Sequence, residues 1–344
     1  NTDLKYTTGT PGSWSTSTIA TVGGEYTSIA LDTSGYPHII FMPTGGYLKY
    51  ITNASGSWDD TTITSAKTGT GRFSSIYIDS SDNIHISYYK YAGSGVLDLM
   101  YSTTTVGSTS FTDETIDGTG SRGVGQYSSL IVDTSNIIHV VYYDQTNYIL
   151  KYSYKTVGGS SWSSPQTIDS IAAVGLHVSL DFNSSNQLFA SYYDNDNQTL
   201  KFAYYSGSSW SYETLDSDSN VGTMTAIAVD KSSSKVNISY VDESNGALKY
   251  ISRNSSSSSF NDPETLTTRQ EVGEYSSLAI DASGNAYIVY YDSTNKNLLF
   301  ATNRSGDWVL ETIDSEDDIG EYAGIDIDDS NQLHVVYYDS TNTN

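Results

Sequence analysis

The chain carries short apolar runs divided by clusters of turn-forming residues, a pattern that is clearest over residues 275–314. Four runs occur there: SLAI (277–280), AYIVYY (286–291), NLLFA (297–301) and WVLETI (308–313). Short runs rich in Tyr, Val and Ile, bounded by Gly, Asn, Asp and Ser, predict β-strands joined by tight hairpins. No segment shows a sustained helical period, so we expect an all-β protein.

The four-run unit recurs seven times along the chain. The residue that ends the first strand of each unit marks its position: Asp32, Asp79, Asp133, Asn183, Asp230, Asp281 and Asp328. These markers are 47 to 54 residues apart, and the 48 residues left over equal one more period, so we expect the chain to close as a ring. Four antiparallel strands recurring every ~40–50 residues predict a β-propeller, here with seven blades.

The two ends of the chain match complementary halves of one repeat. Residues 1–8 (NTDLKYTT) and 12–19 (GSWSTSTI) match the third and fourth strands, whereas residues 334–344 (HVVYYDSTNTN) end just after a second strand. We therefore predict a composite blade of N- and C-terminal strands that closes the ring and removes two sheet edges. Residues 1–344 would then form a single seven-bladed domain.

Two motifs carry a resemblance to known repeat families. The segment LAIDASGNAYIVYYD (278–292) resembles the repeats of secreted bacterial and archaeal propellers of the NHL and SBBP kind. The turns TNASGSW (52–58) and TNRSGDW (302–308) are similar to the Asp-box of sialidase-like BNR propellers, although the glycine stands two residues before the Trp instead of three. This resemblance implies a secreted propeller scaffold. Such families include binding modules, hydrolases, lyases and assembly platforms, so the fold alone does not select a function.

Charge and cysteine content exclude several classes of protein. The 40 acidic and 16 basic residues give a formal charge of −24, which disfavours binding to nucleic acid and to acidic lipid surfaces. No apolar run approaches the ~18 residues of a membrane span, so we expect no membrane insertion. The chain has no cysteine, which excludes disulfides and thiolate chemistry. We expect a secreted or cell-surface protein, either monomeric or one domain of a larger protein.

Residues that recur in every repeat are expected to serve the blade. A glycine lies eight residues before each marker: Gly24, Gly71, Gly125, Gly175, Gly222, Gly273 and Gly320. We expect these glycines to supply positive φ or close backbone approach. The five Trp at the start of fourth strands should pack between blades. Four histidines, His38, His85, His139 and His334, begin second strands, and we assign them a structural role. Lysines of the third strands should pair with carboxylates across the sheet.

The residue after each recurring glycine changes chemistry from blade to blade, and there we place the candidate site. Around the ring it is Glu25, Arg72, Gln126, Leu176, Thr223, Glu274 and Glu321. Ring closure would make Glu25, Glu274 and Glu321 neighbours at the channel mouth, each followed by Tyr26, Tyr275 or Tyr322. Together with Arg72 and His177, these residues form the predicted ligand-binding set. The three glutamates would hydrogen-bond to sugar hydroxyls, bind Ca²⁺ through hard oxygens, hold the acid/base pair that glycoside hydrolysis needs, or arise only as a byproduct of the shared G-E-Y repeat.

Three functions remain open from the sequence. The first is a non-catalytic extracellular binding or adhesion module, lectin-like, whose partner is a glycan or a cell-surface protein and whose site lies on an acidic channel-mouth face. The second is a glycoside hydrolase or polysaccharide lyase of the sialidase type, for which Arg72, Arg122 and Arg269 would supply cations near an acidic sugar. The third is a structural unit of a cell-surface assembly. No residue is assigned a catalytic role.

Overall fold

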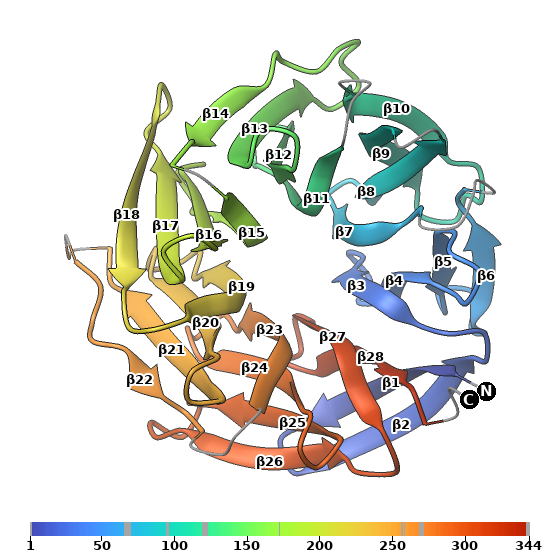
Figure 1. The fold of residues 1–344 in the computed structure, drawn as a ribbon. Helices are drawn as coiled ribbons and strands as arrows, with labels where there is room; N and C mark the ends of the chain where they lie inside the picture. Colours follow the sequence, from blue (N-terminus) through green and yellow to red (C-terminus); the bar gives the residue numbers. More distant parts are fainter. Residues whose placement is uncertain are drawn as a thin grey trace.

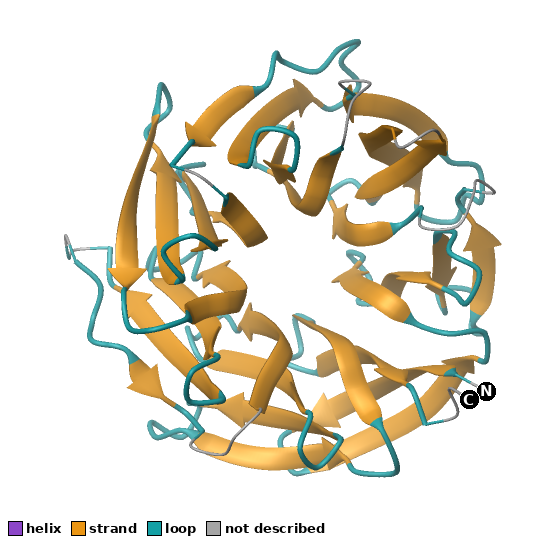
Figure 2. Cartoon of the chain, in the orientation of Figure 1, coloured by secondary structure: helices purple, strands orange, loops and turns teal. Residues whose placement is uncertain are grey.

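The computed structural model describes residues 2–64, 70–93, 96–118, 123–171, 173–255, 257, 259–267 and 272–341. Its described elements are all strands, arranged as seven four-stranded antiparallel sheets around a central opening (Figure 1). This arrangement confirms the predicted seven-bladed β-propeller. Figure 2 shows strands and connecting loops only, and the described residues contain no helix long and apolar enough to cross a membrane.

Each blade runs from an inner strand at the opening to an outer strand at the rim. Blade one is β3 (Glu25–Leu31), β4 (Pro37–Met42), β5 (Lys49–Thr52) and β6 (Asp59–Thr62). Blade two is β7 (Arg72–Ile78), β8 (Asn83–Gly93), β9 (Val96–Thr105) and β10 (Thr112–Asp117). Blade three is β11 (Val124–Val132), β12 (Ile137–Asp144), β13 (Ile149–Thr156) and β14 (Gln166–Asp169). Blade four is β15 (Val174–Phe182), β16 (Leu188–Asp194), β17 (Thr199–Tyr205) and β18 (Trp210–Asp216).

The remaining blades follow the same order. Blade five is β19 (Val221–Val229), β20 (Val236–Asp242), β21 (Ala247–Arg253) and β22 (Glu264–Thr265). Blade six is β23 (Val272–Ile280), β24 (Ala286–Asp292), β25 (Asn297–Thr302) and β26 (Val309–Asp314). Blade seven is composite: β27 (Ile319–Ile327) and β28 (Leu333–Asp339) pair with β1 (Asp3–Thr10) and β2 (Ser13–Ala20) from the other end of the chain. The register Tyr6 to Val336 joins the two halves, as the sequence predicts.

The core is divided among the seven junctions between blades. Second strands such as β16, β20 and β24 are buried along their whole length, which explains why their sequences are continuously apolar and aromatic. The aromatic residue at the start of each fourth strand packs edge-on against the third-strand ring of the preceding blade, for example Trp58 on Tyr6 and Trp308 on Tyr250. The tryptophans therefore stabilise blade packing, as predicted.

The recurring histidines also belong to the scaffold. In blade two, His85 Nδ1 lies 2.7 Å from the Tyr101 hydroxyl and Nε2 lies 3.2 Å from Asp79 Oδ2. His38, His139 and His334 are placed in the same way between a marker aspartate and a third-strand tyrosine. Burial lowers the pKa of all four imidazoles, so they are neutral in the folded protein at pH 7. Their predicted structural role is confirmed.

Candidate functional site

The inner strands begin at one mouth of the central channel, beside the loops that join second and third strands. Strand register shows this directly, because Val272 pairs with Asp292 and Ile319 pairs with Asp339. Glu274 pairs in turn with Tyr291, and the glutamate of blade seven pairs with Tyr338. We call the ring formed by the residues after the recurring glycines the channel mouth: Glu25, Arg72, Gln126, Leu176, Thr223, Glu274 and Glu321.

Directly after the channel mouth, one residue of every blade enters the left-handed backbone region. We call these seven residues, which share φ values of 48° to 54°, the collar: Tyr26, Phe73, Tyr127, His177, Met224, Tyr275 and Tyr322. A positive φ is unfavourable for bulky side chains, so its occurrence in all seven blades marks a conformation imposed by the fold. It accompanies a register shift between each first and second strand, such as Glu274/Ser277.

The recurring glycine next to the collar is part of the same turn. Six of the seven have a φ of 100° to 115°, as expected: Gly71, Gly125, Gly175, Gly222, Gly273 and Gly320. Gly24 fulfils the other expectation, close approach: its φ lies outside the positive region, and the glycine of blade one with a positive φ is Gly23. Gly24 is instead kept small by packing, since a Cβ there would lie 2.8 Å from Leu4 Cδ1.

Hydrogen bonds between blades hold the collar backbone. In three blades the residue after the collar position donates its hydroxyl to the collar carbonyl of the preceding blade: Ser74 to Tyr26 at 3.3 Å, Ser128 to Phe73 at 3.1 Å and Ser276 to Met224 at 2.7 Å. Thr27 donates to the Tyr322 carbonyl in the same way across the ring closure. At these four positions a neighbouring blade satisfies the carbonyl exposed by the strained turn.

The collar side chains contact one another around the channel. Five neighbouring ring pairs have centroids 4.4 to 5.1 Å apart: Tyr26–Phe73, Phe73–Tyr127, Tyr127–His177, Tyr275–Tyr322 and Tyr322–Tyr26. Met224 completes the ring between His177 and Tyr275. All seven line a cavity of about 350 Å³, a size that suits a small ligand. The collar thus gives the channel mouth an aromatic floor.

The three glutamates meet as ring closure predicts, close enough to affect one another electrostatically. Burial raises the pKa of Glu321, and the negative charges of Asp318, Glu274 and Glu25 raise it further. Glu274 accepts a hydrogen bond of 3.5 Å from the Ser293 hydroxyl. All three side chains are half-buried. A site of this kind favours a proton, a cation or a ligand rich in hydrogen-bond donors.

The glutamates are not arranged as a metal site. Within the part of the chain that the structure describes, no group of three or more His, Asp or Glu residues could hold a metal ion. The calcium expectation for Glu25, Glu274 and Glu321 thus finds no support in their geometry. Hydrogen bonding to a ligand is the chemistry that their half-buried carboxylates offer.

The other two predicted site residues lie on the same ring. Arg72 is exposed at the channel mouth, with its Cζ 5.9 Å from the ring centroid of Tyr26. His177 is a collar residue whose ring lies 4.5 Å from that of Tyr127, and burial lowers its pKa to about 4. His177 is therefore a neutral ring at physiological pH. The two further arginines proposed for an acidic sugar, Arg122 and Arg269, lie outside the described residues.

The other loop carboxylates of this face are hydrogen-bonded within the scaffold, and two or three of them share each lysine, so the carboxylates outnumber the lysines that pair with them. Asp144, after β12, accepts hydrogen bonds from its own turn and lies 2.7 Å from Lys151 Nζ. Lys151 also lies 3.2 Å from Asp117 of the preceding blade, which accepts the Tyr142 hydroxyl at 2.7 Å. Equivalent lysines Lys201 and Lys249 pair in the same way. The predicted lysine–carboxylate pairs are confirmed.

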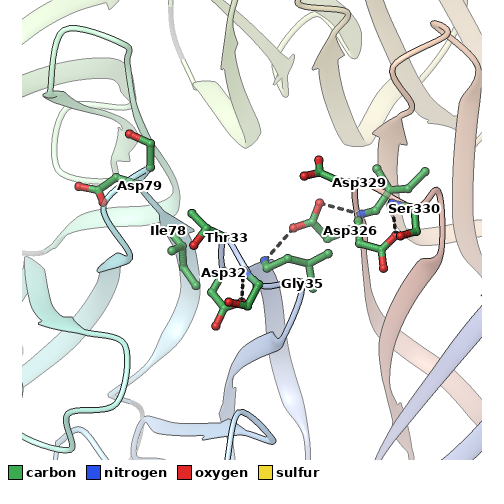
Figure 3. A pocket seen from close by; sticks show the side chains of 13 residues that line it. Asp32, Thr33, Gly35, Ile78, Asp79, Asp326, Asp329 and Ser330 are labelled. Carbon is green, nitrogen blue, oxygen red and sulfur yellow. Dashed lines mark hydrogen bonds between the residues drawn. The ribbon is translucent and has the colours of Figure 1, made fainter.

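The opposite mouth has an acidic hollow that sequence reasoning missed. It measures about 440 Å³ and is lined by the turns that follow β3, β7 and β27. Figure 3 shows the Asp326 carboxylate there, accepting the Leu31 amide at 3.0 Å and the Ile327 amide at 2.8 Å. Burial raises the pKa of Asp326 to about 6. The sequence did hold a signal for Asp326: it lies two residues before the marker of its repeat, where blades one, five and six have alanine.

Comparison with known proteins defines the class of fold. No family model matches the chain, and no curated protein matches it in sequence. Among solved structures, the SapL1 lectin in complex with alpha methyl fucoside is 12% identical, with a TM-score of 0.56 over 84% of this chain and 96% of that one. A polysaccharide lyase described as an ulvan lyase is 10% identical, with a TM-score of 0.62 over 89% and 88%. The microbial sialidase Hz136 is 14% identical, with a TM-score of 0.55 over 94% and 75%. These likenesses establish the propeller fold shared with lectins, lyases and sialidases.

Proposed function

We propose that this protein is a non-catalytic carbohydrate-binding module that acts outside the cell, with its ligand at the channel mouth. One observation carries the proposal: three tyrosines of the collar, Tyr26, Tyr275 and Tyr322, meet directly beside three half-buried glutamates. Aromatic rings pack against the C–H faces of sugars, and carboxylates accept hydrogen bonds from sugar hydroxyls. The charge of the glutamates favours neutral or amine-bearing sugars over acidic ones.

The wider context agrees with this assignment. Propellers of similar fold include a lectin in complex with a fucoside, a polysaccharide lyase and a sialidase. The partner would be a glycan, free or attached to a cell-surface protein. Secretion and descent from NHL-, SBBP- or Asp-box-type repeats remain hypotheses that fit the repeat motifs.

A glycan array tests the proposal. The wild-type protein should bind a subset of neutral or amino-sugar glycans, with or without a calcium chelator. The Tyr275→Ala/Tyr322→Ala and Glu25→Gln/Glu274→Gln/Glu321→Gln variants should each lose the ligands that occupy the channel mouth. An array without any ligand, or one whose ligands all bind both variants unchanged, would contradict the proposal. Release of sugar products from a bound glycan would favour the hydrolase or lyase hypothesis instead.

A further inference from the structure

The repeat pattern breaks at the junction between blades four and five. In the other six blades, a polar side chain at the start of the second strand makes a hydrogen-bonded or close polar contact, as in the Asp–His–Tyr chains. Blade four has Phe189 there, stacked at 6.0 Å on Phe202. Its marker residue is Asn183, where every other blade has aspartate. Asn183 Nδ2 makes a long contact of 3.5 Å with Gln187 Oε1.

A cavity of about 500 Å³ lies at this junction, away from the channel mouth. Asn183, Gln187, Phe189 and Tyr204 line it from blade four. Glu213 of β18, Arg253 at the end of β21, and Ser234, Ser255 and Ser257 also line it. The Tyr212 ring lies on the opposite face of blade four, because Tyr212 pairs with Ala203 and its ring centroid is 4.6 Å from Lys201 Nζ.

Arg253 and Glu213 form a charge-balanced pair inside the wall. The guanidinium Nη1 lies 3.6 Å from Glu213 Oε1, and its Cζ lies 4.8 and 4.9 Å from the ring centroids of Phe202 and Phe260. A guanidinium has five N–H donors in a planar fork, and one contact at this distance leaves most of them for a ligand.

The junction between blades two and three shows what the scaffold alone requires. At equivalent positions of the repeat, Lys155 pairs with Glu114 and lies 5.8 and 5.9 Å from the ring centroids of Tyr101 and Trp162. Both junctions therefore share an ion pair between neighbouring blades and two cation–π contacts. Blades four and five have an arginine in place of the lysine and Tyr204 in place of Thr103.

We propose that the junction of blades four and five is a second saccharide-binding site, separate from the channel mouth, that takes a neutral, hydroxyl-rich sugar ring. Tyr204 presents aromatic surface for stacking. Arg253 donates to, and Glu213 accepts from, neighbouring hydroxyls. The carboxylate in the wall and the net charge of −24 disfavour uronic acids, sulfated sugars and nucleotides. The volume lies within the ~300–1,000 Å³ typical of small-ligand sites.

The test is an NMR titration of the whole chain with methyl glycosides of galactose, mannose, glucose and fucose, and with methyl glucuronide as the anionic comparison. At least one neutral glycoside should shift the Arg253 Nε–Hε signal and the amides of β17 and β18. The variant Arg253→Lys/Tyr204→Thr copies the residues of the blade two–three junction and thus keeps a cation beside Glu213. It should melt like the wild type and bind at least about tenfold more weakly, because a planar fork of donors and a ring are lost.

Lys155→Arg serves as the matched control and should leave the titration unchanged. Tyr204→Thr alone separates the loss of stacking surface from the loss of the guanidinium. The proposal is overturned if no neutral glycoside shifts these signals, if the double variant binds like the wild type, or if methyl glucuronide binds more tightly than every neutral glycoside. Shifts confined to Glu321 and Tyr322 would support the channel-mouth function and overturn this site. Shifts confined to the junction would support this site and contradict glycan binding at the channel mouth.

Discussion

The two halves of the channel mouth share one backbone but differ in chemistry. Blades six, seven and one supply Glu274, Glu321 and Glu25, each above a collar tyrosine. Blades two to five supply Arg72, Gln126, Leu176 and Thr223 above Phe73, Tyr127, His177 and Met224. The collar φ nevertheless varies only from 48° to 54° around the whole ring. Backbone geometry is therefore set by the repeat, whereas side-chain chemistry is free to differ.

The difference indicates that the site is polarised. In the acidic half, burial raises the pKa of Glu321, the charges of Asp318, Glu274 and Glu25 raise it further, and the charge of Lys296 lowers it in part. In the neutral half, Thr223 donates its hydroxyl to Glu243 at 2.5 Å, so its polar group is already used. Arg72 lies at the boundary between the two halves, and its guanidinium lies over the ring of Tyr26, which belongs to the acidic half. A ligand would accordingly bind off the channel axis, toward blades six, seven and one.

The largest expected effect is a loss of stability when the N-terminal strands of blade seven, the middle blade of the acidic half, are removed. Deleting residues 1–20 removes β1 and β2, exposes the edge of β28 and leaves Trp58 without Tyr6 and Phe300 without Trp14. We expect the loss to exceed most of the ~5–15 kcal/mol by which domains are stable. Thermal and urea unfolding measure it.

A peptide of residues 1–20 supplied in trans is the control, and it should restore part of the cooperative transition. An unchanged melting temperature in the truncated protein would contradict the composite blade as the closure of the ring.

The second prediction separates shared backbone from differing chemistry by one substitution in each half. Gly320 has a φ of 112°, and a Cβ there would lie 2.9 Å from Leu298 Cα; Gly222 has a φ of 106°, with Leu200 Cα 2.6 Å from such a Cβ. Gly320→Ala and Gly222→Ala should each cost about 2–5 kcal/mol, from left-handed strain and overpacking together.

Binding should distinguish the two variants. Gly320→Ala displaces Glu321 and Tyr322 and should weaken glycan binding, whereas Gly222→Ala should leave it nearly intact at a temperature where both are folded. Equal binding losses would show that the ligand uses the whole ring.

Much of the fold and part of the candidate site could be predicted from the sequence, because the seven repeats of one chain can be aligned with each other. Seven copies of one strand pattern determine blade number, and matching half-repeats at the two ends determine closure. Closure in turn places Glu25, Glu274 and Glu321 side by side. The same logic assigned the histidines and tryptophans to packing, and the contacts of His85 and Trp58 confirm it.

The parts that were missed depend on geometry that residue identity does not reveal. No propensity predicts that Phe73 or Met224 adopts a positive φ, so the closed collar was not foreseen. Residue identity also does not show that Asp144 is held by its own turn and by Lys151 of the neighbouring strand. The junction of blades four and five became visible only once the cavity beside Arg253 was known.

The smallest expected effect is a change in stability when the three charges that distinguish the acidic half are removed. The pKa of Glu321 is raised by burial and by its acidic neighbours, whereas in the unfolded chain it should lie near the usual ~4.3. A raised pKa means that the folded state favours the protonated carboxyl, so its contribution to stability is present below pH ~4.3 and is lost as the pH rises through the folded pKa. Glu25→Gln/Glu274→Gln/Glu321→Gln should thus stabilise the protein at pH 7 by about 0.5–1 kcal/mol, the size found for like charges on adjacent strands, and should have no such effect at pH 4.

The control is Glu316→Gln/Asp317→Asn/Asp329→Asn, which removes the same charge from exposed positions outside the channel mouth. Urea unfolding of both variants at the two pH values gives the comparison. If the exposed triple stabilises the protein equally, general charge repulsion explains the gain and the acidic half of the mouth holds no special strain.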